Sequence, residues 1–254
     1  MIFYFSATGN NKYVASKIAE ATGDSTISIS ECMKKSIYSF SLKGSESFGL
    51  VIPTYFGGFP KIVIDFLSKL KMNFSADNYV FFIGTYGAGA GNICKEAEKR
   101  LSALGKAPDA TFTIKMVDNW IPYFDMTDRD YIGKAEAEAE PVLADVIEKV
   151  SSHKKELNTD KGMSGFTQRI ATAYYGMACS TKKFSVSDSC IGCGICERQC
   201  PVQAIQVKDG KPEWAKRNVR CASAVSIAAR RMQSHIRRKQ KDMGNIINLA
   251  TKYP

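Results

Sequence analysis

Four closely spaced cysteines in the last third of the chain are the residues best suited to chemistry. They are Cys190, Cys193, Cys196 and Cys200, followed at once by Pro201 in the spacing C-x2-C-x2-C-x3-C-P. This spacing is typical of bacterial iron–sulfur proteins, in which thiolates bind the iron of a [4Fe–4S] cluster. Glycines such as Gly192 and Gly194 let the backbone wrap closely around such a cluster. A structural zinc site fits poorly, because the four cysteines do not form two separated pairs.

A cluster-binding run of this kind needs a second run further along the chain. In two-cluster proteins the fourth cysteine of each run binds the other cluster, so Cys190, Cys193 and Cys196 need a partner from elsewhere. The second run is expected about eighteen residues after Cys200. Only Cys221 occupies one of the four positions required there. The predicted metal ligands are therefore the four cysteines of the first run together with Cys221.

A shift of the reading frame would explain the missing cysteines. If each true codon joins the third base of one written codon to the first two bases of the next, a cysteine requires valine or alanine at the later position. Such residues stand at the four required positions, Val219, Ala222, Val225 and Ala229. Valine and alanine form about 15% of a typical chain, so four chance matches arise about once in two thousand trials. We hypothesise that the chain after about Trp214 is a frameshift product.

The net charge of +10 comes mainly from the same stretch. Between Ala215 and Pro254 there are ten lysines and arginines and one acidic residue, Asp242. If the frame is shifted, this charge is an artefact, and if it is not, the stretch is most simply a solvated segment. A nucleic-acid partner is therefore not predicted.

Length and composition narrow the class of protein. The chain has 254 residues, of which 44% are hydrophobic and 24% charged, as in ordinary globular proteins. It contains neither an apolar stretch long enough to span a membrane nor a signal peptide, so we expect a cytoplasmic protein with no membrane partner. Only two histidines are present, His153 and His235. Histidine-based acid–base catalysis is therefore not expected, and no catalytic residue is assigned.

The first 150 residues alternate between strand-like and helix-like segments, as in an α/β domain with a parallel sheet. The expected strands are Ile2–Phe5, Thr26–Ile29, Phe48–Ile52, Tyr79–Gly84 and Thr111–Lys115. The expected helices are Asn11–Ala21, Pro60–Leu70, Ala90–Leu104 and roughly Ala135–Val150. Together they predict a doubly wound, five-stranded parallel sheet.

Three loops would meet at the carboxyl edge of that sheet, where open α/β sheets bind ligands. The candidate cofactor-binding residues are Ser6, Ala7, Thr8, Gly9, Asn10 and Asn11 in the first loop, Pro53, Thr54, Tyr55, Phe56, Gly57 and Gly58 in the second, and Thr85, Tyr86, Gly87 and Gly89 in the third. The first loop consists of small and polar residues and leads into a helix, an arrangement that suits a phosphate group.

In these loops the chain resembles the flavodoxin family, whose members bind FMN at this edge. The resemblance implies that the Ser6–Asn11 loop binds the FMN phosphate, although Asn11 stands where the family usually has a hydroxyl residue. It also implies that the other two loops flank the isoalloxazine ring, with Tyr55, Phe56 and Tyr86 as the candidates to stack on it. Asp118, Asn119 and Trp120, after the fifth strand, could line the site or cap a loop.

Over about residues 1–130 and 184–213 the chain resembles the flavodoxin–ferredoxin fusion proteins of anaerobic bacteria. We expect a flavodoxin-like domain over residues 1–150 and a linker over 151–183. A small α+β ferredoxin-like domain is expected over 184–213, and its degenerate or frameshifted remainder over 214–254.

The resemblance implies an electron-transfer protein that relays electrons between FMN and one or two [4Fe–4S] clusters. Its partners would be other redox proteins. Two alternatives remain open at this point. One is a flavin-dependent reductase that acts on a small substrate, and the other is a cofactor-poor paralogue that acts as a binding module.

Overall fold

The computed structural model describes residues 1–119, 124–126, 128–159, 162–178, 186 and 190–215. It divides the chain into two compact units. The first consists of Met1–Ser6, Asn10–Val117 and Gly133–Ala173, and the second of Ala7–Gly9 and the described residues of 118–132 and 174–215.

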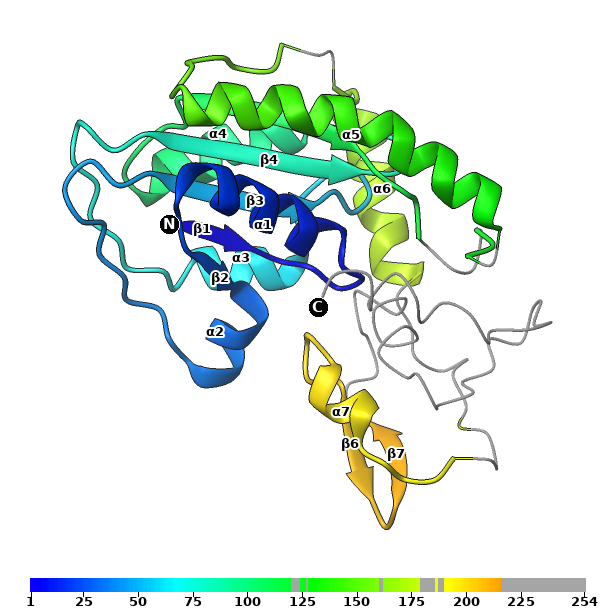
Figure 1. Ribbon diagram of the computed structural model, residues 1–254. Coiled ribbons are helices and arrows are strands. Elements are labelled where there is room, and N and C mark those ends of the chain that lie inside the picture. The colour runs from blue at the N-terminus through cyan, green and yellow to red at the C-terminus, as the bar shows by residue number, and fades with distance from the viewer. Residues whose placement is uncertain (120–123, 127, 160–161, 179–185, 187–189, 216–254) are drawn as a thin grey trace. The chain divides into compact units, whose positions relative to one another are not determined.

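The first unit is built on a parallel sheet of five strands in the order β2-β1-β3-β4-β5 (Figure 1). The strands are β1 (Ile2–Tyr4), β2 (Thr26–Ser28), β3 (Phe48–Pro53), β4 (Val80–Tyr86) and β5 (Ala110–Lys115). All four neighbouring pairs are parallel. The predicted doubly wound sheet is confirmed, and its strand order reverses between β1 and β3, where this topology places its ligand.

Helices cover both faces of the sheet. The helices of the chain up to residue 151 are α1 (Asn10–Thr22), α2 (Ile29–Lys35), α3 (Lys61–Leu67), α4 (Ile93–Leu104) and α5 (Arg129–Ser151), and α6 (Gly165–Ala178) follows them. Val14 and Ile18 of α1 and Leu143 of α5 pack in one core cluster with Val51 and Ile83 of the sheet. The opposite face carries Phe66 of α3, whose ring lies 5.7 Å from that of Phe3. In the part of the chain that is described, no helix is long and apolar enough to cross a membrane.

The second strand is one residue shorter than predicted because a helix begins at Ile29. The Ser28 hydroxyl accepts a hydrogen bond from the Glu31 backbone N–H, at 3.4 Å, and caps α2. Ser36 ends the helix in the left-handed conformation, with its N–H bound to Cys32 O. The β-branched run that suggested a strand is thus overruled by local capping.

The polar stretch after α5, expected as part of a linker, packs along the edge of the sheet. Glu156 donates its N–H to Asp109 O at 3.1 Å and accepts one from Thr111 N–H at 2.9 Å. Asn158 N–H donates to the Thr111 hydroxyl. These bonds extend the sheet beyond β5, and α6 follows within the same predicted linker. The domain boundaries themselves remain predictions.

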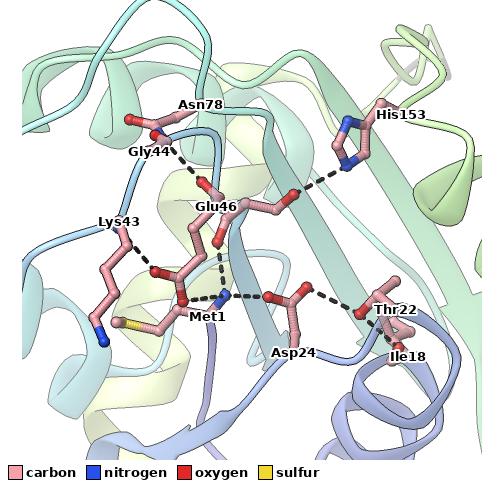
Figure 2. A network of polar contacts seen from close by, with 10 residues as sticks. Met1, Ile18, Thr22, Asp24, Lys43, Gly44, Glu46, Asn78 and His153 are labelled. Carbon is pink, nitrogen blue, oxygen red and sulfur yellow. Dashed lines mark hydrogen bonds and ion pairs between the residues drawn. The ribbon is translucent and has the colours of Figure 1, made fainter.

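A network of polar contacts holds the amino ends of β1 and β3 (Figure 2). The Met1 ammonium donates to Asp24 Oδ1 at 2.6 Å and to Ser47 O at 2.7 Å. It also lies 3.3 Å from Glu46 Oε1. The Ser47 hydroxyl in turn contacts His153 Nε2 at 3.2 Å. Because these charged groups are mostly shielded from water, the attraction between them is only weakly screened.

The second unit contains a short helix and a hairpin. They are α7 (Ile195–Gln199), β6 (Ile205–Lys208) and β7 (Lys211–Trp214), the two strands being antiparallel. The turn between the strands uses Asp209 and Gly210, both with positive φ, as a tight hairpin turn requires. α7 lies within the cysteine run and the hairpin follows it, in agreement with the small α+β region predicted here.

Two glycine substitutions test the packing of the first unit. A Cβ at Gly49 of β3 would overlap the ring of Phe81, whereas Gly133 in α5 has open space around it. We expect Gly49→Ala to lower the free energy of unfolding by about 1–3 kcal/mol through overpacking. Gly133→Ala should raise it by up to about 1 kcal/mol, since alanine favours helix. Urea denaturation of both variants measures this difference, and equal effects would contradict the packing described.

Candidate functional site

A tight turn follows β3 at the carboxyl edge of the sheet. Tyr55 N–H donates to Gly58 O at 2.9 Å, and Gly58 N–H donates to Tyr55 O at 3.1 Å. The two central residues, Phe56 and Gly57, have φ angles of 51° and 80°. The turn is therefore of the type with two left-handed residues, which a bulky side chain such as Phe56 rarely adopts. Both aromatic side chains of the turn are partly exposed.

Thr54, between β3 and this turn, carries a polar atom without a partner. Its N–H donates to Thr85 O at 2.7 Å, which extends the pairing of β3 with β4. Its hydroxyl oxygen is buried and makes no hydrogen bond within the described part of the protein. Buried polar groups are nearly always satisfied, so an orphaned hydroxyl at a ligand-binding edge points to a missing partner.

The third loop begins later than predicted because β4 continues to Tyr86. Thr85 is thus a strand residue and is only 3% exposed. Tyr86 is partly exposed at the end of the strand. Gly87 and Gly89 follow it in the loop, and the space around Gly89 is open.

Asn11 and Thr85 form a buried pair. Asn11 is 3% exposed, and its Oδ1 accepts a hydrogen bond from the Thr85 hydroxyl at 3.0 Å. The residue that departs from the flavodoxin pattern therefore links the first turn of α1 to β4. Its neighbour Asn10 donates from Nδ2 to Val117 O at 3.1 Å, which ties α1 to the end of β5.

Of the other residues of the first loop, Ser6 belongs to the first compact unit, and Ala7, Thr8 and Gly9 fall in the second. There the Thr8 hydroxyl accepts a hydrogen bond from Asn119 Nδ2. Gly9 has a φ of 115°, which only glycine adopts without strain. Asn119 thus caps this loop, one of the two roles considered for it.

One contact to the second and third loops comes from a helix that the sequence did not predict. Gln168 of α6 donates from Nε2 to Phe56 O at 3.0 Å. Its Oε1 accepts from Asn92 Nδ2 at 3.2 Å. Asn92 directly precedes α4 and donates its N–H to Gly57 O at 2.9 Å. α6 was concealed because it directly follows a polar stretch, residues 151–165, that was taken as a linker, although Ser164 is a favoured N-cap residue.

The cysteine run wraps around the start of α7. Gly194 begins the helix with a φ of 71°, and Gly192 has a φ of 67°. A Cβ at Gly192 would overlap Gly210 O, so no side chain fits there. Cys196 and Cys200 are buried, Cys190 is partly buried and Cys193 is exposed.

Backbone N–H groups point at the cysteine sulfurs. Ala204 N–H donates to Cys200 Sγ at 3.2 Å. Burial raises the pKa of the Cys196 thiol, the N–H groups of Glu197 and Cys196 lower it, and Cys190 and Cys193 raise it. Donors aimed at sulfur suit a cluster thiolate. Within the described ranges, no three His, Cys, Asp or Glu side chains surround a point as they would a single metal ion. Cys221 lies outside the described residues.

Two known protein families match separate parts of the chain. The flavodoxin domain family matches residues 1–140. The chain belongs to this family. The 4Fe-4S binding domain family matches residues 186–206, which contain all four cysteines of the run. The predicted combination of a flavodoxin domain and an iron–sulfur motif is therefore confirmed.

Several solved structures resemble this flavodoxin-domain protein at low identity. A putative flavoprotein from Bacteroides uniformis is 18% identical over 46% of this chain and 90% of its own, with a TM-score of 0.35. Rubredoxin oxygen:oxidoreductase from Desulfovibrio gigas is 17% identical, and the match covers 59% of this chain and 36% of its own, with a TM-score of 0.36. The flavodoxin of Streptococcus pneumoniae TIGR4 is 16% identical, and the match covers 57% of this chain and 97% of its own, with a TM-score of 0.33. No curated protein matches the chain.

The buried pair of Asn11 and Thr85 is open to a direct test. Thr85→Val removes the donor and leaves Asn11 Oδ1 buried without it, which should lower the free energy of unfolding by about 1–3 kcal/mol. The double variant Asn11→Leu/Thr85→Val removes both polar partners and should recover most of that loss. Urea denaturation of the wild type, the two single variants Thr85→Val and Asn11→Leu, and the double variant provides the measurement. Additive losses would show that the two side chains act independently.

Proposed function

We propose that this protein transfers electrons between an FMN bound by the flavodoxin domain and a [4Fe–4S] cluster held by the cysteine run. The observation that carries the proposal is the presence of both elements on one chain, a flavodoxin domain over residues 1–140 and a 4Fe-4S domain over 186–206. FMN, when bound, accepts two electrons together or one at a time, whereas the cluster passes one. A chain with both cofactors would convert two-electron transfer at FMN into one-electron transfer at the cluster, and the reverse.

The residues that would hold FMN fit the group in two respects. The Ser6–Asn11 loop leads into α1, whose first turn contains no acidic side chain, so its N-terminal dipole is available to a phosphate. The orphaned Thr54 hydroxyl stands beside the Tyr55–Gly58 turn, where a polar group of the ring system would satisfy it. Tyr55, Phe56 and Tyr86 are the proposed aromatic contacts, since each is partly exposed at this edge.

The residues that would hold the cluster are Cys190, Cys193 and Cys196, with Cys200 serving a second cluster. Their backbone N–H donors would stabilise thiolate sulfur and so tune the reduction potential. In the shifted frame the fourth ligand of the first cluster would be the last cysteine of the second run, at the position of Ala229. In the written frame that thiolate is missing, and Cys221 stands at the second position of the second run. The first site would then have three cysteines, a non-cysteine ligand or no cluster. Both positions lie outside the described residues, and resequencing the 3′ end of the gene decides between the two frames.

The cofactors are tested first by anaerobic purification. Iron, sulfide and flavin are quantified per chain, and FMN is titrated into flavin-free protein. We expect one FMN with about four irons in the written frame, or about eight in a repaired frame. The matched variant Cys196→Ser should lose iron and keep FMN. Protein that binds neither cofactor would favour the binding-module alternative.

The relay itself is tested by following the two cofactors after reduction. Electrons delivered to one should reach the other at a rate independent of protein concentration, and Cys196→Ser should abolish that step. Reoxidation by other redox proteins alone supports the carrier. Reoxidation by a small organic substrate would instead identify a flavin-dependent reductase.

The Thr54 hydroxyl yields a prediction with opposite signs in two assays. Thr54→Val replaces an unsatisfied buried hydroxyl by a methyl group, so the flavin-free protein should be as stable as the wild type or more stable. The same change should weaken FMN binding about tenfold, since one hydrogen bond is lost. Thermal unfolding and fluorescence titration measure the two effects.

Ser30 provides the control, because its hydroxyl in α2 is also buried without a partner among the described residues. Ser30→Ala should match Thr54→Val in stability but leave FMN affinity unchanged. Equal FMN affinity of all three proteins would remove Thr54 from the site.

A further inference from the structure

The N-terminal part of α6 forms a polar clamp on the loops that flank the proposed flavin site. The α6 clamp consists of Met163 and Gln168, just before and within the helix, together with Asn92 before α4. α6 lies beyond residues 1–140, the part of the chain that matches the flavodoxin domain. It is therefore an addition to the matched domain.

The clamp binds both carbonyl groups at the centre of the Tyr55–Gly58 turn. Gln168 Nε2 donates to Phe56 O at 3.0 Å, and Asn92 N–H donates to Gly57 O at 2.9 Å. The Asn92 side chain joins these two contacts, since its Nδ2 donates to Gln168 Oε1 at 3.2 Å and to Met163 O at 2.8 Å. Both peptide orientations of the turn are thus fixed from outside the turn.

The hydrogen bonds to the turn offset the free-energy cost of the left-handed residue Phe56. Phe56 is in the left-handed region, which costs a residue with a side chain about 1–2 kcal/mol. Such a conformation persists only where the surroundings determine it, and it is common next to ligands. The α6 clamp provides these surroundings, because it holds Phe56 in the left-handed conformation.

Close packing leaves the turn little freedom to move. A Cβ on Gly57 would lie 2.8 Å from Met163 Sδ and 2.9 Å from Gln168 Oε1. A Cβ on Gly91 would overlap the Gly57 backbone, and one on Gly162 would overlap the Asn92 side chain. Gly91 therefore packs directly on the Gly57 backbone, and Gly162 packs against the Asn92 side chain and the Gly91 carbonyl group.

Hydrophobic burial does not explain why this part of α6 lies here. Phe166 and Ile170, the large apolar residues near its start, are 76% and 55% exposed. The side chain that faces the loops is the polar Gln168. The first turn is rigid in its own right, because the Ser164 hydroxyl accepts from Thr167 N–H at 3.2 Å. A rigid helix start therefore presents one amide to the turn.

We infer that Gln168 is a positioning residue for FMN, holding the Tyr55–Gly58 turn in the conformation that the ring system meets. The inference rests on the proposed FMN function. Gln168 acts through the Phe56 and Gly57 peptide groups and does not itself touch the cofactor. It thereby sets both the affinity for FMN and the environment that determines the midpoint potential of the bound flavin.

The test uses Gln168→Met in the full chain, which keeps the length and helix propensity of the side chain but removes its hydrogen bonds. In flavin-free protein, amide hydrogen exchange at Asn92 and Gly58 should quicken, because the turn is released. FMN should bind about tenfold more weakly, and the midpoint potential of the bound flavin should shift. Phe166→Ala, on the exposed side of the same helix, is the control and should change none of these.

Each outcome is decisive. Faster amide exchange with unchanged FMN affinity and midpoint potential would show that the clamp is only structural, and would overturn the inference while leaving the proposed function intact. Unchanged amide exchange would show that Gln168 does not hold the turn. Failure of the wild-type chain to bind FMN would overturn the proposed function itself, and with it the inference.

Discussion

The parallel pairing of β1, β3 and β4 is the constraint on which the proposed flavin site depends. Parallel neighbours bring their carboxyl ends to one edge, so the residues that follow each strand are placed together whatever their sequence. The pairing is secured by side chains buried on both faces, including Phe3, Phe81 and Phe82. The loops can therefore carry unusual conformations, such as the left-handed Phe56, because the sheet beneath them is fixed.

The described residues of the cysteine run and the hairpin that follows it depend on a different constraint, a very small core. The buried residues of this core are Cys196, Cys200, Ala204 and Ile205. Two of these four are cysteines of the iron–sulfur motif, so the same side chains serve as core and as ligands. The described residues of this unit bury too little apolar surface to be stable by that means alone. Binding of metal and formation of the fold are therefore expected to be coupled.

The sequence was informative where a pattern is local and periodic. The strands were found from their β-branched and aromatic runs, and the cysteine spacing identified the iron–sulfur motif without further help. The short α2 was missed because Ser28 and Ser36 define it through capping rather than through an apolar face. The role of Asn11 was missed because its partner, Thr85, is brought next to it only by the fold. The α6 clamp was hidden for the same reason, since Gln168 meets Phe56 and Asn92 from a distance of many residues along the chain.

The three glycines that pack around the α6 clamp also constrain how the sequence of this protein can diverge. Gly57, Gly91 and Gly162 come from separate parts of the chain, yet a side chain at Gly91 or Gly162 would enter the space of another segment of the clamp. Mutations at these positions are therefore not independent: one becomes tolerable only after the neighbouring segment has moved away. Among relatives, the three glycines should be inherited or lost as a set.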